Sequence, residues 1–211
     1  MEGGKGAVIA SRQAREPLVL LALVGVALVV SGIHPYDRLT WWLEIAPILV
    51  FFPVLAVSAP RFRLTPLAYR LIFVHALILI VGGHYTYARV PLGEWVKNAL
   101  ELKRNHYDRL GHFAQGFVPA IVAREVLLRR SPLKRGKWLF FLVTTVCLAA
   151  SAAFELVEWA AATVYGADAG AYLATQGDPW DTQWDMFLAL VGAVTAQLSL
   201  RRRHDTELET L

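Results

Sequence analysis

The chain has 211 residues, of which 56% are hydrophobic and 18% charged, and its formal net charge at pH 7 is +4. Soluble domains are roughly 45–50% apolar, so this composition favours a membrane protein with one domain over residues 1–211. The basic residues fall in short stretches between apolar runs, which is typical of membrane topology and argues against a nucleic-acid partner. The single cysteine, Cys147, excludes an internal disulfide and a thiolate metal cluster.

Six apolar segments have the length that a spanning helix needs, which is about 20 residues. In chain order, we expect these helices at about residues 17–33, 41–59, 67–84, 110–128, 137–164 and 183–200. No Ala-x-Ala cleavage site follows the first segment, so we expect a retained helix rather than a signal peptide. Small side chains at 147–153 and 160–162 allow close helix packing and predict a central place for the fifth helix.

The distribution of Lys and Arg predicts that both termini face the cytoplasm. In that orientation 15 of the 21 basic residues lie inside, whereas eleven of the 17 acids lie in outer loops or outer helix halves. Within the outer loop of residues 85–109, Leu92, Trp95 and Leu100 recur at helical spacing. This stripe predicts a short interfacial helix, although a helix packed on its own bundle explains it equally well. The tail 204–211 is interpreted as a solvated, frayed end.

Three pairs of polar residues stand one helical turn apart, and this spacing puts both members of a pair on one helix face. The pairs are Asp108/His112, Glu155/Glu158 and Asp181/Asp185. The expected topology brings all three to the outer side of the membrane, at the level of His84 and Tyr85. Taken singly, Asp108 and Asp181 are better explained as helix caps, and Arg109 as an interfacial anchor.

Glu155 and Glu158 resist a purely structural explanation because they lie inside an apolar helix. An ionised carboxylate there costs roughly 3 kcal/mol or more unless it is paired, protonated or hydrated. Glu44 either joins these two residues or pairs with Arg38. We therefore expect the glutamates to face a polar cavity shared with the nearby bases His84, Arg109 and His112.

Carboxylates and imidazole suit a divalent cation, so a metal cofactor fits the residue types. The candidate metal ligands are Asp108, His112, Asp181 and Asp185. The candidate catalytic groups are Glu155, Glu158, His112 and Asp185. The candidate substrate contacts are Arg109, His84, Tyr85, Tyr107, Gln115, Trp180 and Gln183. No metalloprotease or phosphate-loop signature is present, so metal-free acid–base chemistry, a proton or substrate pathway and a structural ionic network stay open.

Three stretches carry a resemblance to a known family: Asn105 to Phe113 (NHYDRLGHF), Phe154 to Trp159 (FELVEW) and Gln176 to Met186 (QGDPWDTQWDM). They resemble the YjdF-type inner-membrane proteins, a bacterial family of uncharacterised function, over most of residues 20–200. The resemblance implies a multi-pass protein of the bacterial inner membrane, with no established activity.

A second similarity is to the VanZ-like membrane proteins, which are linked to glycopeptide-antibiotic tolerance. Their Asp-Lys-x-x-His-Phe element is close to residues 108–113, and their Glu-x-x-Gln element corresponds to Glu155 to Glu158. Their Asp-x-x-x-Asn-x-x-Gly element corresponds to Asp185 to Gly192, with Ala189 in place of the Asn. The similarity implies a role in the cell envelope.

The sequence therefore predicts an all-α bundle of six transmembrane helices, N-in and C-in, in the lipid bilayer of the inner membrane. Its polar site on the outer face is expected to bind or process a lipid-like envelope substrate. The alternatives are a transporter or ion-coupled carrier, against which the lack of an internal repeat counts, and a structural or accessory membrane protein.

Overall fold

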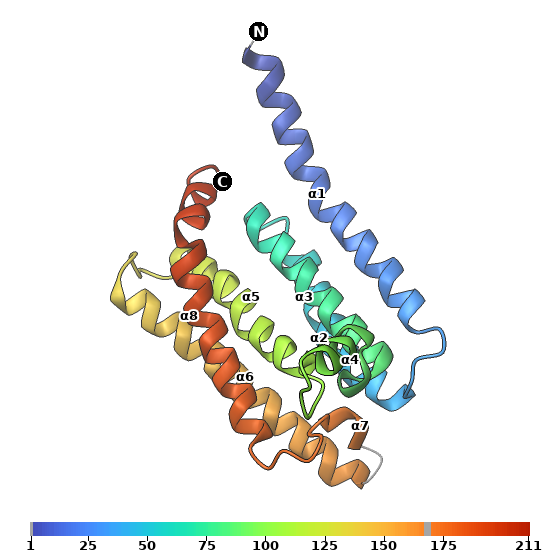
Figure 1. Cartoon of the computed structure of the whole chain (residues 1–211). Helices are drawn as coiled ribbons and strands as arrows, with labels where there is room; N and C mark the ends of the chain where they lie inside the picture. Colours follow the sequence, from blue (N-terminus) through green and yellow to red (C-terminus); the bar gives the residue numbers. More distant parts are fainter. Residues whose placement is uncertain (1, 167–169) are drawn as a thin grey trace.

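The structure is a computed structural model that describes residues 2–166 and 170–211, with side chains for residues 15–166, 170 and 172–211. Over these residues the regular structure is entirely helical, as the sequence predicts (Figure 1). The long helices are α1 (Glu2–Ser31), α2 (Arg38–Ser58), α3 (Pro66–Tyr85), α5 (Tyr107–Arg130), α6 (Lys137–Tyr165) and α8 (Asp181–Leu208). The short ones are η1 (Tyr87–Arg89), α4 (Pro91–Ala99) and α7 (Gly170–Leu173).

Local sequence signals set where two of the long helices begin. The Asp37 carboxylate accepts the Thr40 backbone N–H at 2.7 Å, so α2 starts three residues before the predicted boundary. The Thr65 hydroxyl accepts the Ala68 N–H at 3.3 Å, and Pro66 occupies the first turn of α3. Both arrangements satisfy backbone donors that a helix start leaves free.

By length and composition, α2, α3 and α6 can cross a membrane. The helices α1, α5 and α8 contain 30, 24 and 28 residues, but α5 and α8 carry buried charged groups. Large apolar side chains on the outside of the bundle, such as Val54, Phe141 and Leu156, are exposed as lipid-facing residues are. The number of membrane crossings and their orientation stay predictions.

The central helix of the bundle is α5, which packs against α3, α6 and α8 (Figure 1). The prediction that residues 137–164 lie centrally is therefore wrong. A Cβ atom on Gly116 would collide with the Ala189 carbonyl oxygen of α8, and one on Gly192 would collide with that of Phe113. The backbones of α5 and α8 thus touch at two glycines, and this contact outweighs the longer stretch of small residues in α6.

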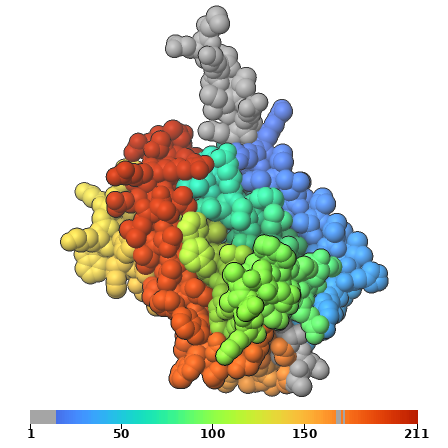
Figure 2. Space-filling model, in the orientation of Figure 1, coloured from blue at the N-terminus to red at the C-terminus, as the bar shows by residue number. Residues whose placement is uncertain are grey.

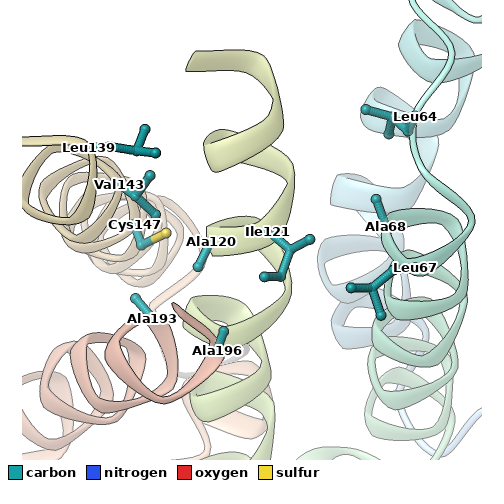
Figure 3. Packing of buried hydrophobic residues seen from close by; sticks show 10 residues of the cluster. All are labelled: Leu64, Leu67, Ala68, Ala120, Ile121, Leu139, Val143, Cys147, Ala193 and Ala196. Atoms are coloured by element: carbon teal, nitrogen blue, oxygen red, sulfur yellow. The ribbon is translucent and has the colours of Figure 1, made fainter. Parts of the chain in front are cut away.

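A layer of fully buried apolar side chains crosses the middle of the bundle, where α5, α6 and α8 meet (Figure 3). We call it the apolar layer, and its members are Ala120, Ile121, Val143, Cys147, Ala193 and Ala196, each 0% exposed. Toward α3, the core continues through Leu64, Leu67 and Ala68. The layer separates the polar groups near the two ends of the bundle.

The start of α1 and the end of α8 lie at one end of the bundle, and α4 and α7 lie at the other (Figure 1). A helix is present in the predicted loop as α4, and its Leu92 and Trp95 are exposed, while its place at a membrane surface stays a prediction. Figure 2 shows α4 and α8 on one face, with only a small part of α5 visible. The prediction of a frayed tail is wrong, because α8 continues to Leu208 and His204 is 0% exposed.

Candidate functional site

Two arginines, one just before α5 and one in its first turn, hold the aspartates at and just before the start of α8. Arg104, in the loop before α5, donates to Asp181 Oδ1 at 2.7 Å and to Asp178 Oδ2 at 3.3 Å. Arg109 donates to the same two carboxylates, at 2.7 and 3.1 Å, and closely to Asp185. We call this group the aspartate–arginine cluster. Its acids also complement the N-terminal dipole of α8.

The imidazole of His112 lies where the three predicted pairs meet. Its Nε2 is 3.5 Å from Asp108 Oδ1 and 3.8 Å from Asp185 Oδ1, and its Nδ1 is 3.8 Å from Glu155 Oε1. The Gln115 side-chain oxygen lies 2.9 Å from Nδ1. The three helical pairs therefore share one end of the bundle, as their spacing and order in the chain predict.

The glutamates form the other side of this centre. Glu155 is 7% exposed, and its Oε1 has no hydrogen-bond partner among the described residues, nor has the buried Ser151 hydroxyl one turn along α6. Glu44 is 4% exposed and interacts with Asp108, so it joins the centre. Arg38, its alternative partner, instead donates to the Gly32 carbonyl oxygen at 2.7 Å.

Two buried tyrosines outside the long helices close this side of the centre. Burial raises the pKa of Tyr172 in α7, and Glu158, Glu44 and Glu155 raise it further. Burial also raises the pKa of Tyr87 in η1, and the charge of Glu44 raises it further. Both phenols therefore stay protonated beside the carboxyl groups. Sequence reasoning missed Tyr172, because a tyrosine in a short connecting helix carries no periodic signal.

The described residues of this centre contain more acids than bases. The carboxyl groups belong to Asp108, Asp178, Asp181, Asp185, Glu44, Glu155 and Glu158. The bases are Arg104, Arg109, His112 and His75 of α3, which interacts with His112, and the two arginines bind the aspartates of the aspartate–arginine cluster. Buried carboxyl groups in excess of bases favour a bound cation or protons.

Four predicted substrate contacts lie outside this centre. His84 Nδ1 is 2.8 Å from the Ser31 carbonyl oxygen, and its ring packs edge-on against Tyr85, which is 40% exposed. Trp180, at the N-cap of α8, and Gln183, in its first turn, are exposed. The prediction that these four side chains line the site is not supported. It relied on depth in the bundle, and depth does not determine the direction in which a helix residue points.

The first residues of the motif at the start of α5 hold the loop in place. Asn105 is 0% exposed, and its amide donates to the Val90 carbonyl oxygen at 3.0 Å. The Gln176 side chain bonds both the N–H and the carbonyl oxygen of Asn105, each at 2.9 Å. Tyr107 donates to the Ile78 carbonyl oxygen at 3.1 Å. Tyr107 therefore anchors α5 to α3, which differs from its predicted role as a substrate contact.

A second buried polar network lies at the opposite end of the bundle. Glu125 is 0% exposed and accepts hydrogen bonds from the Thr65 hydroxyl at 2.8 Å and the Thr65 N–H at 3.1 Å. His204 Nε2 is 3.1 Å from Glu125, and Arg124 bridges His204 Nδ1 and Asp205 at 2.8 and 2.7 Å. We call this the Glu125–His204 network. It fixes the end of α5 to the start of α3 and the end of α8.

These features define an α-helical membrane protein with a buried carboxylate–histidine centre at one end of its bundle. The chain belongs to the family described as "Predicted membrane protein (DUF2238)", which matches residues 16–206. It is 52% identical over 181 residues to "Inner membrane protein YjdF" of Escherichia coli (strain K12), covering 86% of this chain and 87% of that protein. The resemblance to YjdF-type proteins is thus confirmed.

No solved structure matches the chain. Neither the family match nor the YjdF match concerns the VanZ-like proteins, so that similarity stays a prediction from three short motifs.

Proposed function

We propose that this chain is a multi-pass protein of the bacterial inner membrane whose outward-facing carboxylate–histidine centre binds or processes a lipid-like substrate of the cell envelope. One observation carries the proposal: buried carboxyl groups exceed bases, and Glu155 faces His112 with an oxygen that no described donor satisfies. Such groups inside a membrane bundle are costly and mark functional sites.

The proposed topology has six crossings, with both termini inside, in one domain. In the described part of the chain, three helices meet the requirements of length and composition, and α1, α5 and α8 are longer than the roughly 20 residues needed. The start of α1 and the end of α8 share one end of the bundle (Figure 1), as an even number of crossings requires. The surplus of Lys and Arg at that end favours the cytoplasm.

A lipid-like substrate suits the surroundings of the centre. Leu156 and Val157, between Glu155 and Glu158 in α6, are 64% and 54% exposed, and Phe187, two residues after Asp185 in α8, is 49% exposed. An acyl chain in the bilayer therefore has apolar surface on the outside of the two helices that carry these carboxyl groups, at the same level of the bundle. His112, Glu155 and Glu158 are proposed as acid–base groups. Arg109 is already engaged by three aspartates, so we assign it to positioning rather than to an anionic substrate group.

The alternative function as a transporter or ion-coupled carrier receives less support, because the apolar layer lies between the polar groups at the two ends of the bundle. Below Ser151 on α6, the same helix face continues with Cys147 and Val143, both 0% exposed. A continuous polar route to the Glu125–His204 network is therefore missing among the described residues. A centre open to one side agrees better with an enzyme or binder than with alternating access.

Lipid analysis of cells tests the proposal. A strain lacking the protein should show an altered level of one envelope lipid or lipid-linked species, and the wild-type chain should restore it. The variant Glu155→Gln, at equal abundance, should fail to restore it, because the buried acid is lost. The matched control is Glu94→Gln, which changes an acid paired with Lys97 on α4. Identical lipid profiles in all strains, and no lipid co-purifying with the wild type, would contradict the proposal.

A further inference from the structure

We infer that Asp108, His112 and Asp185 bind one divalent transition-metal ion. One ligand-type atom from each residue lies within 4.8 Å of the others, and their residues are 6%, 6% and 2% exposed. The inference rests on the proposed function only in placing the metal at the same centre. Metal binding is measurable without any substrate.

The orientation of the His112 imidazole directs one ring nitrogen, Nε2, toward the two carboxylate ligands. Gln115 Oε1 lies 2.9 Å from His112 Nδ1, where it accepts a hydrogen bond in the tautomer that metal binding at Nε2 requires. Nε2 faces Asp108 Oδ1 at 3.5 Å and Asp185 Oδ1 at 3.8 Å. These separations are long for hydrogen bonds. They approach the roughly 3–3.5 Å between ligand atoms that share a metal at about 2.0–2.2 Å.

The arginines bind both carboxylate ligands. Arg109 donates to Asp185 Oδ1, the same oxygen that faces His112 Nε2, and an Arg104 nitrogen is 3.5 Å from Asp108 Oδ2. Ligand carboxylates in metal sites are commonly fixed by such hydrogen bonds. Asp181, a ligand candidate from the sequence, is instead held at 2.7 Å by both arginines and serves as their counter-ion.

Glu155 provides an independent observation that points to a cation. Its side chain is 5% exposed, and its Oε1 has no hydrogen-bond partner among the described residues and lies 3.8 Å from His112 Nδ1, while Thr182 interacts with the same carboxyl group. A buried carboxylate oxygen without a donor is unfavourable, and a nearby metal ion with its bound water removes that cost.

The types of ligand atom narrow the choice of metal ion. One imidazole with two carboxylates suits the series from Mn²⁺ to Zn²⁺ better than Ca²⁺, which takes oxygen ligands only. Side-chain exposure rises from 3% at Asp185 through 8% at Asp108 to 25% at Asp178. The aspartates thus extend from the buried site to the more exposed Asp178.

Metal binding to the full-length protein in detergent tests the inference. After chelator treatment, Zn²⁺ or Mn²⁺ is added, and bound metal is measured by calorimetry and by elemental analysis of the desalted protein. We expect one ion per chain. Co²⁺ should give a visible absorption spectrum that His112→Gln abolishes. Asp185→Asn should weaken affinity at least about 10-fold. Asp181→Asn is the matched control, since it removes an equivalent acid from the same arginine and should retain the metal.

Two results would overturn the inference. One is a wild-type protein that is monodisperse and helical yet binds no metal, because the centre is then an ion-pair network around a protonated His112. The other is an equal loss of metal in Asp181→Asn and Asp185→Asn, which would indicate a general charge effect. Metal binding without any lipid phenotype would leave the inference standing and remove the proposed function.

Discussion

Arg109 shares with Arg104 the compensation of the buried charge at the start of α8. Its guanidinium contacts Asp178, Asp181 and Asp185, and its side chain is only 12% exposed. Replacing a buried partner of this kind leaves carboxylates without a counter-charge, and such losses are larger than the net value of the ion pair itself.

We therefore expect Arg109→Gln to lower the free energy of unfolding by about 3–5 kcal/mol. The double variant Arg109→Gln/Asp185→Asn should recover part of this loss, because it removes one uncompensated carboxylate. Denaturant or thermal unfolding in detergent measures both. Arg70→Gln is the control: its ion pair with Glu16 is partly exposed, so it should cost no more than about 1 kcal/mol. Equal losses in the two single variants would refute this account of the cluster.

At the scale of helices, the contact between α5 and α8 depends on two glycines that leave no room for a side chain. The variant Gly116→Ala forces its methyl group against the Ala189 carbonyl, so the helices must separate. We expect a loss of about 1–3 kcal/mol or more, together with a displaced centre, measured by thermal stability and detergent-resistant folding. Gly25→Ala in α1 is the matched control, because nothing lies within 4 Å of its Cβ position, and it should be tolerated. A Gly116→Ala variant as stable as Gly25→Ala would show that the contact is loose.

The helices and their order were predictable because apolar length and N-cap signals are local properties. The packing partners of each helix were not predictable. Nothing in the local sequence distinguishes Gly116 and Gly192 from other glycines, and their role depends on the contact between the backbones of α5 and α8. The meeting of the three polar pairs followed from i,i+3 and i,i+4 spacing. The direction of His84 depended on helix rotation, and the burial of His204 depended on a contact with α5 that no local pattern reveals.

At the scale of the whole molecule, the proposed orientation predicts which loops a membrane-impermeant thiol reagent reaches. Asn98→Cys on α4 should react in spheroplasts, whereas Lys134→Cys, between α5 and α6, should react only after lysis. Both positions are exposed, and the native Cys147 is fully buried and serves as an unreactive background. The reverse pattern would invert the proposed topology and place the carboxylate–histidine centre inside the cell.

In the proposed topology, the apolar layer also has an electrical consequence. With Ile121, Val143, Cys147 and Ala193 fully buried, the region between the two polar ends has a low dielectric constant. Most of the transmembrane voltage then falls across this layer, and little falls across the aspartates and His112. Binding or release of a cation or proton at the centre therefore moves almost no charge across the transmembrane potential. Its occupancy follows the ions and pH of the medium that it faces, and changes in membrane potential leave it nearly unaffected.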